Sequence, residues 1–85
     1  MITADQIEAK LRAAFPDADH IQVVDTTGTF DHYDAVVVDA SFEGTPRVRQ
    51  HQAVYAALGD SMRADIHALA LKTLTPKRWA AAQAK

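Results

Sequence analysis

The chain has 85 residues, of which 48% are hydrophobic, and a formal net charge of −2. This composition excludes a disordered chain and is typical of one small globular domain. The absence of cysteine excludes a disulfide framework and a thiol nucleophile. No stretch reaches the roughly 20 apolar residues of a membrane helix, and the polar N-terminal residues lack the apolar core of a signal peptide. We expect a single domain over residues 1–85 in the cytoplasm.

The charges are distributed unevenly along the chain. Residues 1–45 carry nine acids against two bases, a net charge of −7, whereas residues 46–85 carry seven bases against two acids, a net charge of +5. A chain with this charge asymmetry can orient a charged partner. The alternative is that two solvated faces differ in sign without any role in binding.

Residues 3–6 predict the start of a first helix. Thr3-Ala-Asp-Gln6 is a capping-box pattern, in which the Thr3 hydroxyl accepts a hydrogen bond from the Gln6 backbone and the Gln6 side chain reaches back. Ile7 and Leu11 then recur at helical spacing. Because the residue before a proline is pushed out of the helical region, Pro16 ends this helix, which we place at residues 4–14.

Two strands follow. Residues 20–25 alternate, with Ile21 and Val23 on one face, and residues 33–39 are rich in β-branched valine. An antiparallel pair is the simplest connection. The intervening loop, residues 26–32, is longer than a tight hairpin needs, and extra loop length is a common place for function.

A second helix is predicted over residues 46–58. Pro46 suits its first turn, and Gly59 is placed to end it. On a helical wheel, five side chains share one side and predict the buried face: Val48, His51, Val54, Tyr55 and Leu58.

A third strand and a last helix complete the chain. Residues 66–74 alternate, with one face made of His67, Leu69, Leu71 and Thr73. Thr75 is a helix cap followed by proline at the first helical position, so the last helix covers residues 76–84. Trp79 is the expected anchor of this helix in the core.

These elements predict an α+β fold of order α-β-β-α-β-α: a two-layer sandwich with a three-stranded mixed sheet and helices on one face. The helical link between the second and third strands is long enough for a right-handed crossover, which makes a parallel pair possible there. The expected core contains Ile7, Leu11, Ile21, Val23, Val48, Leu58, Leu69, Leu71 and Trp79.

The sequence contains no evident catalytic constellation and no glycine-rich phosphate loop, so we do not expect an enzyme. The four histidines are of interest because imidazole is the commonest metal ligand. His20 is most simply a surface residue, and His51 a partly buried core residue with one hydrogen bond. His32 and His67 have no evident packing reason, but their spacing alone does not say whether they meet.

The stretch from residue 42 onward closely resembles the BolA family. The residues that carry the resemblance are Phe42-Glu-Gly44, Val48, His51-Gln-Ala-Val-Tyr55, Leu58, Ile66-His-Ala-Leu69, Lys72-Thr73, Thr75-Pro76 and Trp79. The first helix and the first two strands fit less specifically, so the match covers nearly the whole chain. The family fold is α-β-β-α-β-α, similar to the type II KH arrangement, in agreement with the predicted elements.

The resemblance implies a non-enzymatic partner of a monothiol glutaredoxin. Such a protein shares a [2Fe–2S] cluster with the glutaredoxin and its glutathione, in the complex only, and acts in iron–sulfur cluster trafficking or iron and redox sensing. The family's C-terminal histidine ligand matches His67, and its second ligand, in the loop between the first two strands, matches His32. Phe30, in the same loop, is a candidate partner contact. The apo form is expected to be a monomer.

The second function known in the family is that of a DNA-binding transcriptional regulator. Arg47, Arg49 and Arg63 are the candidate nucleic-acid-binding residues here, for weak and salt-sensitive binding. The alternative is that these arginines only form a solvated face.

Two departures weaken the nucleic-acid reading. The family often has arginine on both sides of the position of His51, where this chain has Gln50 and Gln52. A KH domain clamps the backbone of RNA with a Gly-X-X-Gly loop, and residues 44–47 have only the first glycine.

Overall fold

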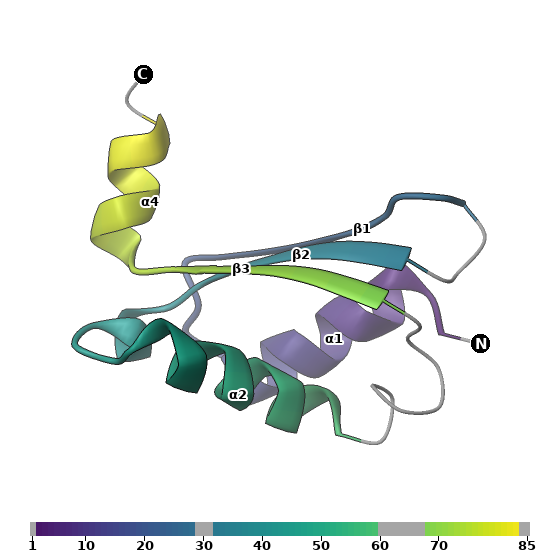
Figure 1. Ribbon diagram of the computed structural model, residues 1–85, viewed down its shortest axis with the longest axis horizontal. Coiled ribbons are helices and arrows are strands. Elements are labelled where there is room, and N and C mark those ends of the chain that lie inside the picture. The colour runs from purple at the N-terminus through teal and green to yellow at the C-terminus, as the bar shows by residue number, and fades with distance from the viewer. Residues whose placement is uncertain (1, 29–31, 60–67, 84–85) are drawn as a thin grey trace.

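A computed structural model of the protein describes residues 2–28, 32–59 and 68–83. The three strands form one sheet in the order β1-β2-β3, and helices α1 and α2 lie against one face of it (Figure 1). The elements, in chain order, are α1 (Ala4–Ala14), β1 (His20–Asp25), β2 (His32–Val38), the 3-10 turn η1 (Ala40–Phe42), α2 (Arg47–Leu58), β3 (Ala68–Leu74) and α4 (Pro76–Gln83). The predicted α+β class is confirmed. Among these residues no helix has the length and apolar character to cross a membrane.

The capping box predicted at the start of α1 is present. The Thr3 hydroxyl accepts a hydrogen bond from the Gln6 backbone N–H at 3.1 Å, and the Gln6 side-chain oxygen accepts one from the Thr3 backbone N–H at 2.9 Å. Two backbone donors that the helix cannot satisfy internally are therefore paired. Ile7 and Leu11 follow at helical spacing, and both are fully buried against the sheet.

The sheet is mixed, as predicted. Strand β1 runs antiparallel to β2, with His20 opposite Val38, and β3 runs parallel to β2, with His32 opposite Ala68. The second strand begins one residue earlier than predicted, at His32. Residues 66 and 67 of the predicted third strand lie outside the described residues.

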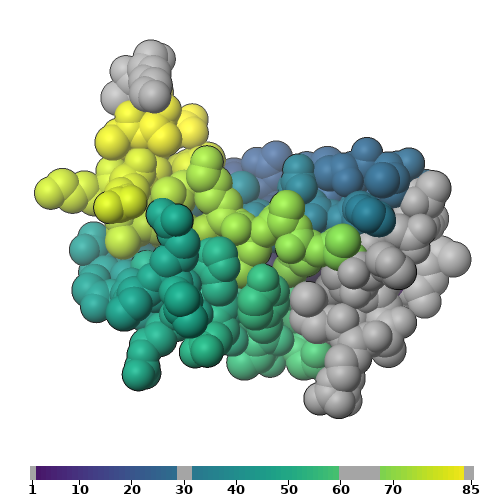
Figure 2. Space-filling view, in the orientation of Figure 1, coloured from purple at the N-terminus to yellow at the C-terminus, as the bar shows by residue number. Residues whose placement is uncertain are grey.

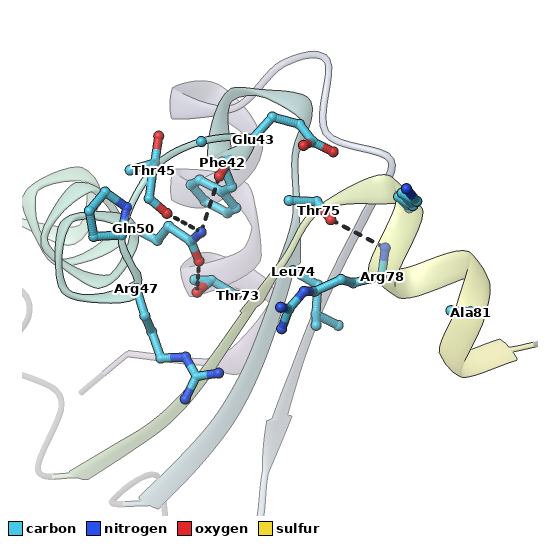
Figure 3. A pocket seen from close by; sticks show the side chains of 13 residues that line it. Phe42, Glu43, Thr45, Arg47, Gln50, Thr73, Leu74, Thr75, Arg78 and Ala81 are labelled. Carbon is cyan, nitrogen blue, oxygen red and sulfur yellow. Dashed lines mark hydrogen bonds between the residues drawn. The ribbon is translucent and has the colours of Figure 1, made fainter.

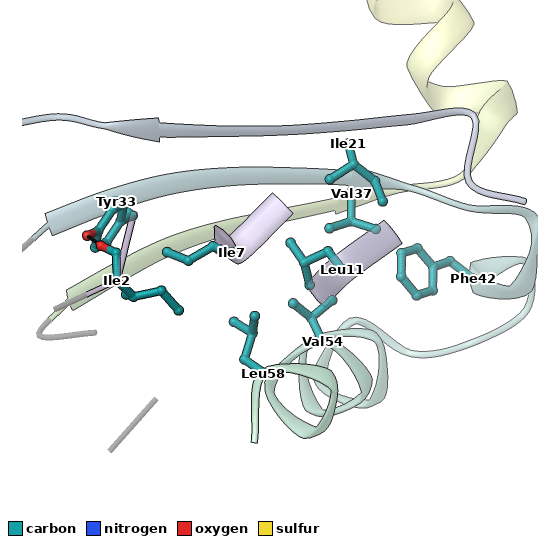
Figure 4. Packing of buried hydrophobic residues seen from close by; sticks show 9 residues of the cluster. All are labelled: Ile2, Ile7, Leu11, Ile21, Tyr33, Val37, Phe42, Val54 and Leu58. Atoms are coloured by element: carbon teal, nitrogen blue, oxygen red, sulfur yellow. Dashed lines mark hydrogen bonds between the residues drawn. The ribbon is translucent and has the colours of Figure 1, made fainter. Parts of the chain in front are cut away.

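The core lies between the sheet and helices α1 and α2 (Figure 4). Its buried members are Ile2, Ile7, Leu11, Ile21, Tyr33, Val37, Phe42, Val54 and Leu58, and the partly buried side chains packed against them include Val23, Leu69 and Leu71. The predicted core facing of Ile21 and Val23 on β1 and of Leu69 and Leu71 on β3 is therefore confirmed. The one polar atom of the Tyr33 ring system is satisfied, because its hydroxyl donates to the backbone carbonyl of Ile2.

The predicted buried face of α2 is partly wrong. Val54 and Leu58 are buried, but the Val48 side chain is 67% exposed and Tyr55 is 38% exposed. Apolar residues occur on more than one side of this helix, so the helical wheel permitted two orientations. The structure turns Gln50, rather than Val48, toward β3, where the Gln50 amide oxygen accepts a hydrogen bond from the Thr73 hydroxyl. Pro46 also precedes the helix as its N-cap instead of starting its first turn.

The expected burial of Trp79 in the main core is also wrong. Helix α4 has no fully buried residue, and Trp79 is only partly buried. The Trp79 ring stacks on the ring of His20. The His20 side chain lies on the face of β1 opposite to that of the core residue Ile21. In Figure 1, α4 rises from the end of β3, away from the side where α1 and α2 lie. The helices therefore do not all cover one face of the sheet.

Candidate functional site

His32 opens strand β2 with an exposed side chain. The backbone carbonyl of His32 accepts hydrogen bonds from the Thr26 backbone N–H at 3.0 Å and the Thr26 hydroxyl at 3.2 Å. These two bonds close the base of the loop between β1 and β2, so the backbone position of His32 is held by the sheet. The imidazole therefore projects from a rigid element and not from the middle of a loop.

The start of β3 lies beside the start of β2. His32 is paired with Ala68 in the parallel register, and His67 is the residue immediately before Ala68 in the sequence. The predicted parallel pairing of these two strands is confirmed. The side chains of His67 and Phe30 lie outside the described residues, as does Arg63, so their predicted roles stay predictions.

The other two histidines have packing partners. The Trp79 ring lies 4.6 Å from the His20 ring, centroid to centroid, with 14° between the planes, and Nε2 of His20 is 3.2 Å from Gln22 Oε1. His51 is partly buried and meets Tyr55 edge-on with centroids 6.4 Å apart. Within residues 2–28, 32–59 and 68–83, no three histidine, cysteine or acidic side chains gather to hold a metal ion.

A groove of about 760 Å³ opens between the start of α2, the end of β3 and the start of α4 (Figure 3). Its basic lining residues are Arg47, Lys77 and Arg78, and Glu43 is the one acid among the lining residues described. A smaller hollow of about 200 Å³ adjoins it along β3 and adds His51 and Lys72. We call the two together the basic groove.

Gln50 forms the floor of the basic groove. Its amide nitrogen donates to the carbonyls of Phe42 at 3.2 Å and Thr45 at 2.8 Å, and its amide oxygen accepts the Thr73 hydroxyl at 2.6 Å (Figure 3). One side chain thus joins the turn after β2, helix α2 and strand β3. These contacts link residues 23 positions apart, and no local pattern in the sequence indicates them.

The basic groove is a site that was not predicted from the sequence. Arg47 and Arg49, two of the predicted nucleic-acid-binding residues, are both exposed on α2, but only Arg47 lines the groove. Figure 2 shows β3 on the molecular surface, with α2 along one side and α4 at one end. The sequence feature that could have predicted the groove is the charge difference between the two halves of the chain, because every basic residue of the groove belongs to residues 46–85.

Comparison with known proteins identifies the family. The family described as "BolA-like protein" matches residues 11–78. The chain is 35% identical to the "DNA-binding transcriptional regulator BolA" of Escherichia coli, covering 93% of this chain and 81% of that one. It is 38% identical to "BolA-like protein 2" of Mus musculus, over 92% of this chain and 91% of the relative. A bol-like protein from Babesia bovis has a similar crystal structure, with a TM-score of 0.84, 28% identity and coverage of 98% and 95%. The chain therefore belongs to the family of BolA-like proteins.

Proposed function

We propose that this protein is a non-enzymatic partner of a monothiol glutaredoxin and shares a [2Fe–2S] cluster with it, with His67 and His32 as its own ligands. The single observation that carries the proposal is the parallel register that sets His32 opposite Ala68, the residue after His67. His67 directly precedes Ala68 in the sequence, and Ala68 begins β3 at the end of the sheet where His32 begins β2. The exposed side chain of His32 is accessible to a partner at this end.

The residues present fit a shared cluster better than a resident one. A [2Fe–2S] cluster takes four protein ligands, which are usually thiolates, and in Rieske centres two histidines replace two cysteines on one iron. This chain has no cysteine, so it can supply imidazole nitrogens but no thiolates. A second molecule must provide the sulfur ligands. The glutaredoxin and its glutathione supply those thiolates in the proposed complex.

Imidazole ligation has a chemical consequence for cluster transfer. A neutral imidazole carries less negative charge than a thiolate, so the reduction potential of the cluster is higher. Because the imidazole must lose its proton before it binds a metal, acid releases the cluster. A protein that hands over or senses a cluster needs such a labile site.

The test is reconstitution of the mixed complex. The apo protein, a monothiol glutaredoxin and glutathione are combined with iron and sulfide without oxygen, and the visible absorbance and circular dichroism are recorded. We expect His67→Ala to abolish or redirect cluster binding, and His32→Ala to shift the spectrum and shorten the cluster lifetime. The effect of His32→Ala should be smaller, because water or a neighbouring side chain can replace a ligand at this exposed position.

His20→Ala is the matched control for these two variants. It removes an imidazole at the other end of the sheet, where His20 lies opposite Val38. The cluster spectrum should be unchanged in this variant. A complex whose spectrum and cluster lifetime are the same with and without the His67 imidazole would contradict the proposal.

DNA binding is the second candidate function. It is favoured by the exposed Arg47 and Arg49 on α2 and by the name of the Escherichia coli relative. Binding through such side chains is electrostatic, so it should fall steeply between about 50 and 200 mM salt. Titration of duplex DNA against the protein and its Arg49→Gln variant tests it, and absence of binding at about 50 mM salt contradicts it.

A further inference from the structure

We propose that the basic groove binds an acidic, extended peptide segment of another protein, which adds to the sheet as a fourth strand beside β3. This site goes beyond the proposed cluster function and does not depend on it. Three observations support it: the open edge of β3, the unpaired cations along that edge, and their distribution on both sides of the strand.

Among the residues that the structure describes, strand β3 has a free edge. In the sheet order β1-β2-β3 it pairs with β2 alone. Apart from that ladder, the one additional backbone hydrogen bond of β3 among the described residues is from the Asp39 N–H to the Leu74 carbonyl, at 3.1 Å. The other open edge, on β1, is different, because the Arg12 side chain donates to the Ile21 carbonyl at 3.3 Å. An unpaired strand edge offers backbone donors and acceptors to an added strand.

The cations along this edge are not neutralised. In the part of the chain that the structure describes, the ion pair present is that of Arg12 with Glu8. The side-chain nitrogens of Arg47, Lys72, Lys77 and Arg78 make no hydrogen bond or ion pair with the described residues. Clustered cations without partners repel one another, and an acidic ligand relieves that repulsion.

The cations flank both sides of the strand. Arg47 comes from α2, which packs on the core face of the sheet, whereas the Lys72 side chain lies on the face of β3 opposite to Leu71. The guanidinium groups of Arg47, on α2, and Arg78, on α4, both lie near β3 (Figure 3). Because side chains alternate along an added strand, its successive residues point to the two sides. The side chains on both faces of the added strand would lie near positive charge, so a peptide with acidic residues on both faces fits the groove.

The lining of the groove favours a peptide over a nucleic acid. Proteins that bind single-stranded nucleic acid stack bases on exposed aromatic rings. Among the described residues that line the main part of the groove, Phe42 is the one aromatic, and it is buried in the core. The open backbone edge instead provides what an extended polypeptide needs. The groove also lies at the Thr73–Arg78 end of β3, whereas His32 and Ala68 lie at the other end.

The test uses a fluorescein-labelled nonapeptide of three Glu-Val-Glu repeats and the apo protein, followed by fluorescence anisotropy. Two analogues carry N-methyl groups on alternating residues, one on the odd and one on the even positions. An added strand uses the N–H groups of alternate residues only. We therefore expect one analogue to bind as the parent peptide does and the other at least about tenfold more weakly, since several backbone bonds of about 1 kcal/mol each are lost.

Charge variants locate the site. Arg47→Gln together with Arg78→Gln should weaken peptide binding about tenfold, as expected when two charge-assisted contacts are removed. Arg49→Gln is the matched control, since Arg49 is exposed on the same helix but does not line the groove. It should change the affinity less than about twofold. The amide signals of residues 71–74 should shift in a ¹⁵N spectrum on peptide binding, and their hydrogen exchange should slow.

Three outcomes would overturn the proposal. Equal affinity of the two methylated analogues would show a purely electrostatic attraction. Binding of a single-stranded oligonucleotide in the groove, with no binding of the peptide, would identify a nucleic-acid site. Self-association in sedimentation experiments that protects the β3 edge would identify a second copy of this chain as the occupant.

Discussion

The indole ring of Trp79 stacks on the imidazole ring of His20, with centroids 4.6 Å apart and 14° between the planes. This contact joins the last helix to the first strand, on the side of β1 opposite to the core residue Ile21. Val38, which is opposite His20 in the sheet, is fully buried although it does not belong to the main core. Helix α4 therefore docks through a small contact separate from the core.

The first prediction concerns this stack. His20→Ala should lower the free energy of unfolding by about 1 kcal/mol, the value of a well-placed aromatic pair. It should also shift the emission of Trp79, the only tryptophan of the chain, toward longer wavelength. Urea unfolding and fluorescence emission measure the two effects. His51→Ala is the control, because His51 contacts Tyr55 instead, and an equal emission shift in that variant would exclude the stack as the cause.

The second prediction concerns Gln50, which holds the floor of the basic groove. Gln50→Leu should destabilise the protein by about 2 kcal/mol, because it leaves the Thr45 carbonyl and the Thr73 hydroxyl without a partner, while the Phe42 carbonyl keeps its bond from the Thr45 backbone N–H. Chemical denaturation measures the loss. Gln52→Leu is the matched control on the exposed side of the same helix, and its cost should stay within about 0.5 kcal/mol. Equal costs for the two leucine variants would show that the Gln50 hydrogen bonds add no stability.

Thr73→Val tests the same hydrogen-bond network from the strand. In a double-mutant cycle, Gln50→Leu and Thr73→Val should couple by about 1 kcal/mol, since they share one hydrogen bond of 2.6 Å. Strictly additive losses would mean that the two side chains do not interact in solution.

The third prediction separates the two sides of α2. Leu58→Ala should cost about 3 kcal/mol, because Leu58 is a fully enclosed member of the core and its truncation leaves a cavity. Val48→Ala, on the same helix, should change stability by no more than about 0.5 kcal/mol, since the Val48 side chain is 67% exposed. Thermal or urea unfolding measures the stability loss of the two variants. A large loss for Val48→Ala would restore the helix orientation expected from the sequence alone.

The fourth prediction concerns the N-terminal capping box. Thr3→Ala should lower the free energy of unfolding by about 1 kcal/mol, as for other N-cap replacements. Thr3→Ser keeps the hydroxyl and should restore most of the loss. The two variants are compared by urea unfolding. If serine were no better than alanine, the hydrogen bond from the Gln6 backbone N–H to the Thr3 hydroxyl would contribute nothing.

The sequence by itself determined the features that depend on neighbouring residues. The capping box of Thr3 and Gln6 and the alternation of Ile21 with Val23 lead directly to α1 and β1. The Thr75 cap is equally local, and its hydroxyl accepts from the Arg78 backbone N–H at 3.2 Å. Such signals are local because hydrogen bonds at helix ends and side-chain alternation in strands involve residues only a few positions apart.

Only the tertiary structure decided which side of α2 is buried, where α4 docks, and which basic residues meet. Each outcome depends on contacts between distant segments, such as Gln50 with Thr73 and His20 with Trp79. The parallel strand register belongs to the same class, because it pairs residues 36 positions apart, His32 with Ala68. The physical reason is that a side chain with two possible environments takes the one that satisfies its polar atoms and fills space, and those environments exist only once the sheet and helices have assembled.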